Sequence, residues 1–500
     1  MRATRSAGDR QRPRIDTVRP TNLLVIMSDE HSRRVLGCYG NKMIKTPNLD
    51  ALAARGTRFT DAYCNSPICV PSRASFATGR YVHQIRFWDN AIPYDGSIPS
   101  WGHRLMDAGS RVTSIGKLHY RDTHDPNGFD EEIIPLHVVD GVGDLLGLIR
   151  EDAPVRTAAL RLAEEAGPGP SSYQRYDDDI AARSADWLKT RAKAYAGKPW
   201  VLFVSLVLPH FPLKVEQRFF DLYPEDSVPL PAMYAPDERP RHPYIDEMRR
   251  TMVYDQAFTP ERVRRAIAAY YGMVTKLDEN IGTVLSALEE SCFAGDTRVI
   301  YTSDHGDNLG TRGLWGKSTM YEESAGVPLI LAGPDVPAGK AVRTPTTLVD
   351  AFPSIVEGAG LPQHPDDRDL PGRSLWHMAK GATPERTVLC EYHAVGASAA
   401  TYMIRVGKYK YVHYVDMPPM LFDLETDPDE RRDLGRDPAH RETVSRCEAA
   451  LREVVDPEAA DRLARADQKA RIDQFGGREA VIRRGSFGHS PIPGEKATFG

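Results

Sequence analysis

The sequence SPICVPSRASFATGR, residues 66–80, decides what the rest of the chain is expected to be. It reads Cys-x-Pro-Ser-Arg from Cys69 and closes with Thr-Gly-Arg at residues 78–80. A small buried thiol beside a proline turn would be the ordinary structural explanation, because free cysteine is among the most buried residue types. A pattern that is complete over the twelve residues from Cys69 favours a catalytic function instead. That function requires a metal site and a cationic pocket from other parts of the chain.

Size and composition indicate a globular enzyme. The chain has 500 residues, enough for one large domain and a smaller one. Its 41% hydrophobic and 27% charged residues are ordinary values, and its net charge of -5 gives no reason to expect a nucleic-acid partner. The six cysteines show no paired spacing and predict no disulfide framework; they are residues 38, 64, 69, 292, 390 and 447.

The N-terminal stretch, residues 1–20, is rich in arginine and lacks the apolar core of a secretory signal. We expect a solvated basic arm there, with an arm that clasps a second subunit as the alternative. No apolar run approaches the roughly 20 residues needed to span a bilayer, so no membrane partner is expected. The sequence therefore predicts a cytoplasmic protein.

Four short runs predict strands, and the two apolar runs at 23–27 and 200–208 suit strands buried on both faces, as in a parallel sheet with helices on both sides. The four runs are residues 23–27, 111–115, 200–208 and 298–303. Polar residues that can carry chemistry follow each run: Asp29 and Glu30, Lys117 and His119, His210, and Asp304 with His305. Open α/β sheets place their ligands beyond the carboxyl ends of the strands. These residues are therefore expected to meet at one edge of the sheet, with Cys69 supplied by a loop near the first strand.

Helical patterns lie between the strands. The longest covers residues 260–290, and a second amphipathic pattern covers residues 176–194. Another helix is predicted to begin near Ser72, which would bring backbone N–H dipoles close to Cys69.

The sequence pattern changes near residue 386. Short β-like runs joined by turns predict a small antiparallel sheet there, followed by a helix at 443–454. We expect a basic arm at 1–20, a catalytic α/β domain at 21–385, a C-terminal sheet-and-helix subdomain at 386–475, and an extended tail at 476–500. The tail has little capacity to form a core, so it should lie along a neighbouring subunit or its own domain. A dimer or tetramer is the expected assembly.

The Cys69 pattern and the strand-end residues together resemble the type I sulfatases, which are formylglycine-dependent members of the alkaline phosphatase-like superfamily, from about Asn22 onward. The resemblance implies an α/β fold with a large mixed, mainly parallel sheet flanked by helices, plus a smaller C-terminal antiparallel-sheet subdomain. It also implies that a formylglycine-generating enzyme oxidises Cys69 to formylglycine. The aldehyde hydrate would then be the nucleophile of an arylsulfatase-like sulfuric ester hydrolase acting on a small organic sulfate.

The same resemblance implies one divalent cation, held by Asp29, Asp304, His305 and the hydrate oxygen on residue 69. Glu30 stands where many sulfatases have a second aspartate, and it would either bind the ion or merely line the site. Carboxylate oxygens favour a hard ion, with Ca²⁺ expected first. Several sulfatases have asparagine at the position of His305, and an imidazole there makes Mn²⁺ the alternative.

In the implied mechanism one hydroxyl of the hydrate attacks sulfur and forms a covalent sulfo-enzyme. The second hydroxyl is then deprotonated, and its collapse back to the aldehyde expels sulfate. Arg73 should hold residue 69 and neutralise charge, while Lys117 and Lys317 stabilise the sulfate oxygens. His119 is the candidate for the second proton transfer. His210, with Lys317, should protonate the leaving oxygen.

Three alternatives compete with this interpretation. A phosphonate monoester or phosphodiester hydrolase would use the same site, although those enzymes often have alanine where this chain has Ser72. A choline sulfatase would need an aromatic cage, for which Trp88, Tyr94 and Trp101 are available. A binding protein with a dead site would be expected to have lost a key residue, and none is lost. The segments expected to line the pocket, about 85–101, 120–175 and 211–260, carry no motif that identifies the alcohol.

Overall fold

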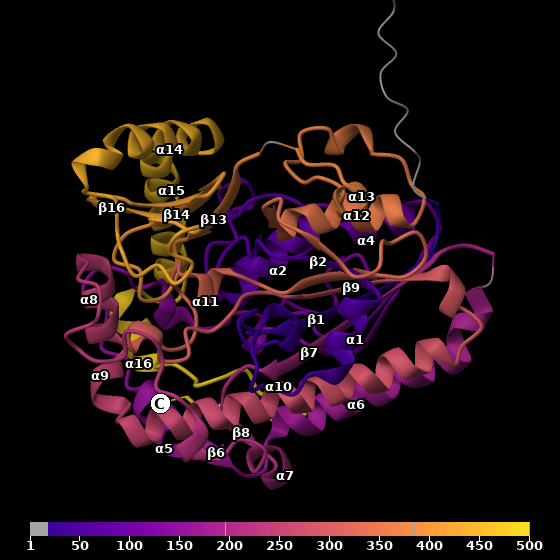
Figure 1. Ribbon diagram of the computed structural model, residues 1–500, viewed down its shortest axis with the longest axis horizontal. Coiled ribbons are helices and arrows are strands. Elements are labelled where there is room, and N and C mark those ends of the chain that lie inside the picture. Colours follow the sequence, from indigo (N-terminus) through magenta and orange to yellow (C-terminus); the bar gives the residue numbers. More distant parts are fainter. Residues whose placement is uncertain (1–18, 196, 385, 500) are drawn as a thin grey trace, which may run out of the picture.

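The computed structural model describes residues 19–195, 197–384 and 386–499, and a mixed sheet of eight strands forms its centre (Figure 1). The strand order is β11-β2-β10-β9-β1-β7-β4-β5. Neighbouring strands run parallel except where β10 pairs with β9 and β2. The strands are β1 (Asn22–Asp29), β2 (Gly56–Phe59), β4 (Arg111–Lys117), β5 (Glu131–Leu136), β7 (Trp200–Pro209), β9 (Thr297–Ser303), β10 (Leu329–Ala332) and β11 (Lys340–Val342). The predicted α/β fold with a large, mainly parallel sheet is confirmed.

Helices bury both faces of this sheet. Successive side chains of a strand point to opposite faces, so Leu23 and Val25 of β1 enter one apolar core and Leu24 and Ile26 enter the other. Figure 1 shows α10 and α6 along one side of the sheet and α2, α4 and α12 on the opposite side. The helices of these two layers are α1 (Pro47–Ala54), α2 (Cys69–Thr78), α4 (Trp101–Asp107), α6 (Ser172–Asp186), α10 (Pro260–Glu289), α12 (Ala351–Gly358) and α13 (Leu375–Lys380).

Shorter elements connect the layers and build the site. They are α3 (Val82–Ile85), α5 (Ala158–Glu165), α7 (Gln217–Phe220), α8 (Pro243–Thr251), α9 (Tyr254–Ala257) and α11 (Glu322–Ala325). Two small parallel pairs join β3 (Ala62–Tyr63) to β12 (Thr346–Thr347) and β6 (Gly167–Pro168) to β8 (Lys214–Val215).

The helix predicted near Ser72 begins three residues earlier, at Cys69. Pro71 therefore lies in its first turn, where the missing N–H removes no intrahelical hydrogen bond. Ile68 is the extended residue that precedes the helix. Cys69 thus occupies the first helical position, with all ten residues of α2 buried.

The predicted C-terminal sheet is present. Its four antiparallel strands are β13 (Val388–Tyr392), β14 (Thr401–Val406), β15 (Tyr409–Tyr414) and β16 (Met417–Asp423). The helix α14 (Arg441–Val454) follows them. The exact domain boundaries given above stay predictions.

The structure corrects the interpretation of the last fifty residues. Instead of one final helix and an extended tail, α15 (Pro457–Gln474) and α16 (Arg478–Arg484) follow α14. These helices are rich in charged residues and bury few apolar ones, which explains why an apolar pattern did not reveal them. Val481 of α16 packs against Leu145 and Leu148 of the same chain. The tail therefore no longer argues for a dimer or tetramer, which stays a prediction.

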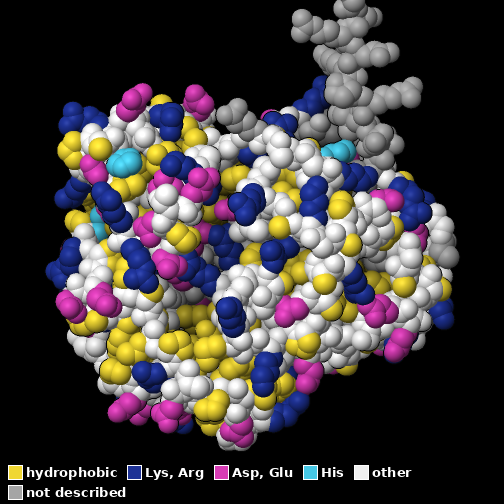
Figure 2. Space-filling view, viewed as in Figure 1, with side chains coloured by type: hydrophobic (Ala, Val, Ile, Leu, Met, Phe, Trp, Pro, Cys, Tyr) yellow, Lys and Arg dark blue, Asp and Glu magenta, His cyan; other side chains and the backbone are white. Residues whose placement is uncertain are grey.

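Residues 1–18 of the predicted basic arm lie outside the described residues. Within the described part of the chain, no helix combines the length and apolar character needed to cross a bilayer. On the face shown in Figure 2, basic and acidic side chains are interspersed.

Candidate active site

Four of the predicted site residues meet in one buried cluster beyond the carboxyl ends of the central strands. Asp29 ends β1, Asp304 and His305 follow β9, and Cys69 opens α2. One possible donor atom from each lies within 4.8 Å of every other. The Sγ of Cys69 is 3.7 Å from Asp29 Oδ1 and 3.3 Å from His305 Nε2. The structure therefore assembles the predicted set.

Arg73 bridges the two aspartates of this cluster. Its Nε donates to Asp304 Oδ2 at 2.8 Å, and its Nη2 donates to Asp29 Oδ2 at 2.9 Å. Lys117 Nζ lies 2.6 Å from the same oxygen of Asp29. Burial would raise the pKa of Asp29, but Lys117, His210 and Arg73 together hold it well below its usual range. The carboxylate is held ionised, with Oδ1 left for the cluster.

The loop after β9 presents its ligand atoms in a fixed orientation. His305 Nδ1 is 3.1 Å from the carbonyl oxygen of Gly306, to which it donates, so Nε2 offers a lone pair to the cluster. The Ser72 hydroxyl donates to the carbonyl oxygen of Asp304 at 2.6 Å. Two carboxylates and one imidazole nitrogen, all buried and close together, form a donor set typical of a divalent cation site. These residues fit the ion implied by the sequence.

Glu30 lies beside the cluster and groups with Asp29 and His210. Its Oε2 is 3.1 Å from Lys317 Nζ, while its Oε1 is buried and has no hydrogen-bond partner among the described residues. Burial, with Lys317 opposing it, raises the pKa of Glu30 to about 8. An unpartnered buried oxygen is costly, and a cation there would relieve that cost. Glu30 therefore lines the site and offers one further donor.

Lys317 reaches the cluster from the loop that precedes α11. Its Nζ lies 3.2 Å from Cys69 Sγ and 2.9 Å from His210 Nε2. The backbone N–H of Ser318 donates to the carbonyl oxygen of Pro67 at 3.0 Å, which ties this loop to the Cys69 loop. Burial and Asp29 raise the pKa of the Cys69 thiol to about 12, so the thiol is neutral at pH 7. The sulfur occupies the position that the resemblance assigns to the oxygens of a formylglycine hydrate.

His119 has a partner that the sequence did not reveal. Its Nε2 lies 2.9 Å from the hydroxyl of Ser490 in the C-terminal tail, and its Nδ1 is buried without a partner among the described residues. Tyr173 donates to the carbonyl oxygen of Ser490 at 2.6 Å. Burial and Lys117 hold the pKa of His119 well below its usual range, so the imidazole is neutral. No local pattern marks Ser490, because its position depends on how the tail folds back.

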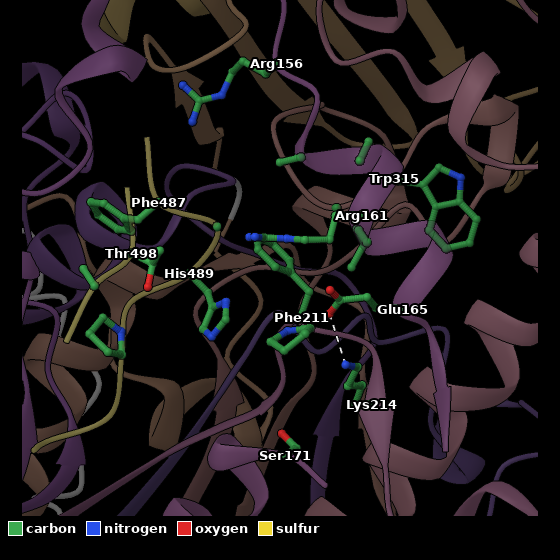
Figure 3. A pocket seen from close by; sticks show the side chains of 18 of the residues that line it. Arg156, Arg161, Glu165, Ser171, Phe211, Lys214, Trp315, Phe487, His489 and Thr498 are labelled. Carbon is green, nitrogen blue, oxygen red and sulfur yellow. Dashed lines mark ion pairs between the residues drawn. The ribbon is translucent and has the colours of Figure 1, made fainter. Parts of the chain in front are cut away.

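Lys317 is also one of the residues that line a cavity of about 500 Å³. Figure 3 shows other side chains of this lining. Parts of the predicted segments 120–175 and 211–260 line the cavity, and residues of the tail between 487 and 498 form another wall. Nothing from the predicted segment 85–101 belongs to the lining. The tail was missed as a pocket element because it carries no catalytic motif.

The aromatic cage considered for choline is wrong. Trp88, Tyr94 and Trp101 are almost fully buried, and none of them lines the cavity. Trp101 packs edge-on against Phe203, and Tyr94 packs against Tyr120, with ring centroids 6.1 and 4.8 Å apart. These rings fill the apolar core and are not available to a ligand.

A family model described as Sulfatase matches residues 21–361. The chain belongs to the sulfatase family. A second model, described as the C-terminal part of N-sulphoglucosamine sulphohydrolase, matches residues 310–456. This membership confirms the predicted family and the predicted enzyme class, a sulfuric ester hydrolase.

Curated relatives match over most of their length. The chain is 32% identical to the choline-sulfatase of Rhizobium meliloti (strain 1021) over 484 residues, which are 94% of each chain. It is 30% identical to human arylsulfatase K over 433 residues, covering 82% of this chain and 78% of that protein.

Solved structures confirm the fold. A protein solved with its substrate D-glucosamine-2-N,6-O-disulfate has a TM-score of 0.71 at 22% identity, covering 90% of this chain and 99% of its own. The phosphonate monoester hydrolase of Agrobacterium radiobacter has a TM-score of 0.70 at 24% identity, covering 87% of this chain and 95% of its own.

Proposed function

We propose that this sulfatase-family protein hydrolyses a small organic sulfate through a formylglycine formed from Cys69. The position of Cys69 carries the proposal, because its side chain ends among Asp29 and His305 and also touches Lys317. An oxygen at that point could contact a metal ion and a sulfate group while a lysine stabilises the negative charge.

The proposed cofactor is one divalent cation, Ca²⁺ in the first instance and Mn²⁺ as the alternative. Asp29, Asp304, His305 and an oxygen of residue 69 would hold it, with Glu30 as a further donor. When bound, the ion would lower the pKa of the hydroxyl and polarise a sulfate oxygen.

The surrounding residues would bind the sulfate and move protons. Lys117, at the end of β4, and Lys317, from the loop before α11, would supply positive charge, the first beside Asp29 and the second beside residue 69. His210 Nε2 accepts from Lys317 Nζ at 2.9 Å while its Nδ1 donates to the carbonyl oxygen of Phe211 at 2.7 Å. Neutral His210 would therefore orient the Lys317 ammonium, and the two residues together would protonate the leaving alcohol oxygen. His119 would accept the proton that is released when sulfate departs. Arg73 would hold both aspartates and residue 69 in position through its hydrogen bonds to Asp29 and Asp304.

Further proposals follow from this chemistry. Maturation would require a formylglycine-generating enzyme, because oxidation of the Cys69 thiol to an aldehyde needs an oxidant that has to be supplied from outside the chain. A cytoplasmic location and a dimer or tetramer are retained as proposals from the sequence.

Comparison of substrates tests the function. Formylglycine-containing protein is assayed for kcat/KM on an aryl sulfate, choline sulfate and phenyl phosphonate. Faster hydrolysis of a sulfate ester supports the proposal. A preference for the phosphonate by orders of magnitude would establish the phosphonate monoester hydrolase alternative instead.

A further inference from the structure

The cavity beside Lys317 is lined by more basic than acidic side chains. The basic residues are Arg156, Arg161, Lys214, Lys317 and Lys496, and the acidic residues are Glu165 and Glu495. On the face shown in Figure 2, by contrast, basic and acidic side chains are interspersed. The excess of basic side chains therefore suits the cavity to an anionic ligand.

Ion pairs within the structure neutralise some of these groups but not all. Lys214 Nζ lies 3.1 Å from Glu165, drawn as the dashed line in Figure 3, and Glu495 lies 3.5 Å from Arg175. Both carboxylates of the lining thus already have a basic partner. Arg161, by contrast, forms no ion pair with any described residue, and neither does Lys496.

Arg161 is the cation best placed to meet a ligand. It lies on α5, and its side chain extends toward Phe487 and His489 of the tail (Figure 3). Its Nη2 lies so close to Gly488 that a methyl group added there would collide with it. Burial lowers the pKa of His489 and the charge of Arg161 lowers it further, which is consistent with a guanidinium near this wall. Apolar rings such as Phe211 and Trp315 also line the cavity, while Arg161 itself is solvent-exposed and therefore free to meet a ligand that enters from solvent.

Two aromatic residues of the cavity, Phe211 and Trp315, are poorly placed to bind a quaternary ammonium. Lys317 Nζ already lies 5.3 Å from the centre of the Phe211 ring, and the His210 ring lies 4.1 Å from the same ring. Trp315 is stacked on Phe258 with ring centres 3.8 Å apart. The Phe211 ring is therefore already beside the Lys317 ammonium, and Arg161 adds a second positive charge. Both charges would repel a cationic substrate.

We propose that the alcohol part of the substrate carries a second anionic group, which Arg161 binds in this cavity. This proposal rests on the proposed sulfate-ester hydrolysis and extends it to a substrate class. The sulfate to be cleaved would sit at Lys317, and the second group, a carboxylate or another sulfate, would lie toward the tail. Arginine suits both groups because its planar guanidinium can donate two parallel hydrogen bonds.

Rigid aryl sulfates that differ only in charge test the proposal. The substrates are the sulfate esters of meta-hydroxybenzoate and meta-hydroxybenzamide, resorcinol disulfate, and choline sulfate. The benzoate or the disulfate should exceed the benzamide in kcat/KM by about two- to fivefold, as expected for a charge pair at a solvent-exposed arginine. The faster of the two anionic substrates identifies the group that is bound. Choline sulfate should be the poorest substrate.

Two variants connect the preference to the residue. Arg161→Gln should remove most of the preference for the anionic esters and leave hydrolysis of the benzamide nearly unchanged. Arg183→Gln is the matched control, since Arg183 is an exposed helical arginine on α6 that does not line the cavity. Equal rates on the charged and neutral esters, or a preference that survives Arg161→Gln, would overturn this inference while leaving sulfate hydrolysis intact. No hydrolysis of any sulfate by formylglycine-containing protein would overturn the proposed function as well.

Discussion

Ser490 hydrogen-bonds His119 through a contact of 2.9 Å between the serine Oγ and the histidine Nε2, although 371 residues separate them. The contact is buried, and the Tyr173 hydroxyl donates a hydrogen bond to the backbone carbonyl oxygen of Ser490. A tail with little core of its own thus determines the orientation of a candidate catalytic imidazole.

Ser490→Ala should lower kcat about two- to tenfold, the value of one lost hydrogen bond, with little change in KM. The reason is that His119 loses the group that fixes its ring. Ser490→Thr should restore much of the rate, because it keeps the hydroxyl. Ser227→Ala, which removes an exposed hydroxyl elsewhere, is the control. An unchanged kcat in Ser490→Ala would show that the tail does not position His119.

Arg73→Met should destabilise the metal-free protein by about 3–5 kcal/mol, because it leaves two buried carboxylates without their shared cation. Denaturant unfolding in the presence of a chelator measures this free energy. Arg80→Met is the control: Arg80 pairs with Asp369, which is 65% exposed, and such a pair contributes about 0–1 kcal/mol. Equal losses in the two variants would contradict the structural role given to Arg73.

A divalent ion should raise the melting temperature of the protein, and Asp304→Asn should abolish that rise. At an ion concentration one hundred times the dissociation constant, binding would contribute about 2.7 kcal/mol. Thermal unfolding with Ca²⁺, with Mn²⁺ and with a chelator measures the effect and ranks the two ions. Asp369→Asn, which changes an exposed carboxylate, should respond to the ion as the unaltered protein does. A full response in Asp304→Asn would place the ion elsewhere.

Lys317→Gln should reduce kcat/KM about a hundredfold or more, as when one preorganised donor to a developing charge is removed. The lysine touches both residue 69 and His210, so charge stabilisation and proton delivery are lost together. Lys408→Gln is the control, because Lys408 is only partly buried and pairs with Asp423 on the C-terminal sheet. A loss of less than about threefold would be smaller than one neutral hydrogen bond usually provides and would remove Lys317 from the mechanism.

Much of the sheet could be predicted from the sequence because its central strands β1, β7 and β9 are buried at every position, and β1 and β7 carry long apolar runs. The run at 200–208 became β7, and Asp304 with His305 followed β9 as expected. A parallel sheet brings such strand ends to one edge, so the cluster of Asp29, Asp304 and His305 follows from local patterns alone.

Contacts that depend on the tail could not be predicted in this way. The helix α15 is charged over most of its surface, and the apolar periodicity that reveals a buried helix is weak there. The position of Ser490 and the cavity wall near Arg161 arise only when the tail packs on its own chain. The prediction that Trp88 could belong to a ligand cage was wrong because an aromatic ring is equally suited to an apolar core, and the sequence alone does not distinguish the two.

The most direct measurement is mass spectrometry of the peptide that contains Cys69, in protein produced together with a formylglycine-generating enzyme. The account predicts that the cysteine is replaced by the aldehyde. Sulfatase activity should rise in proportion to the aldehyde fraction, and Cys69→Ala should have none. A peptide that keeps its thiol, in protein that hydrolyses sulfate esters at the full rate, would contradict the central claim.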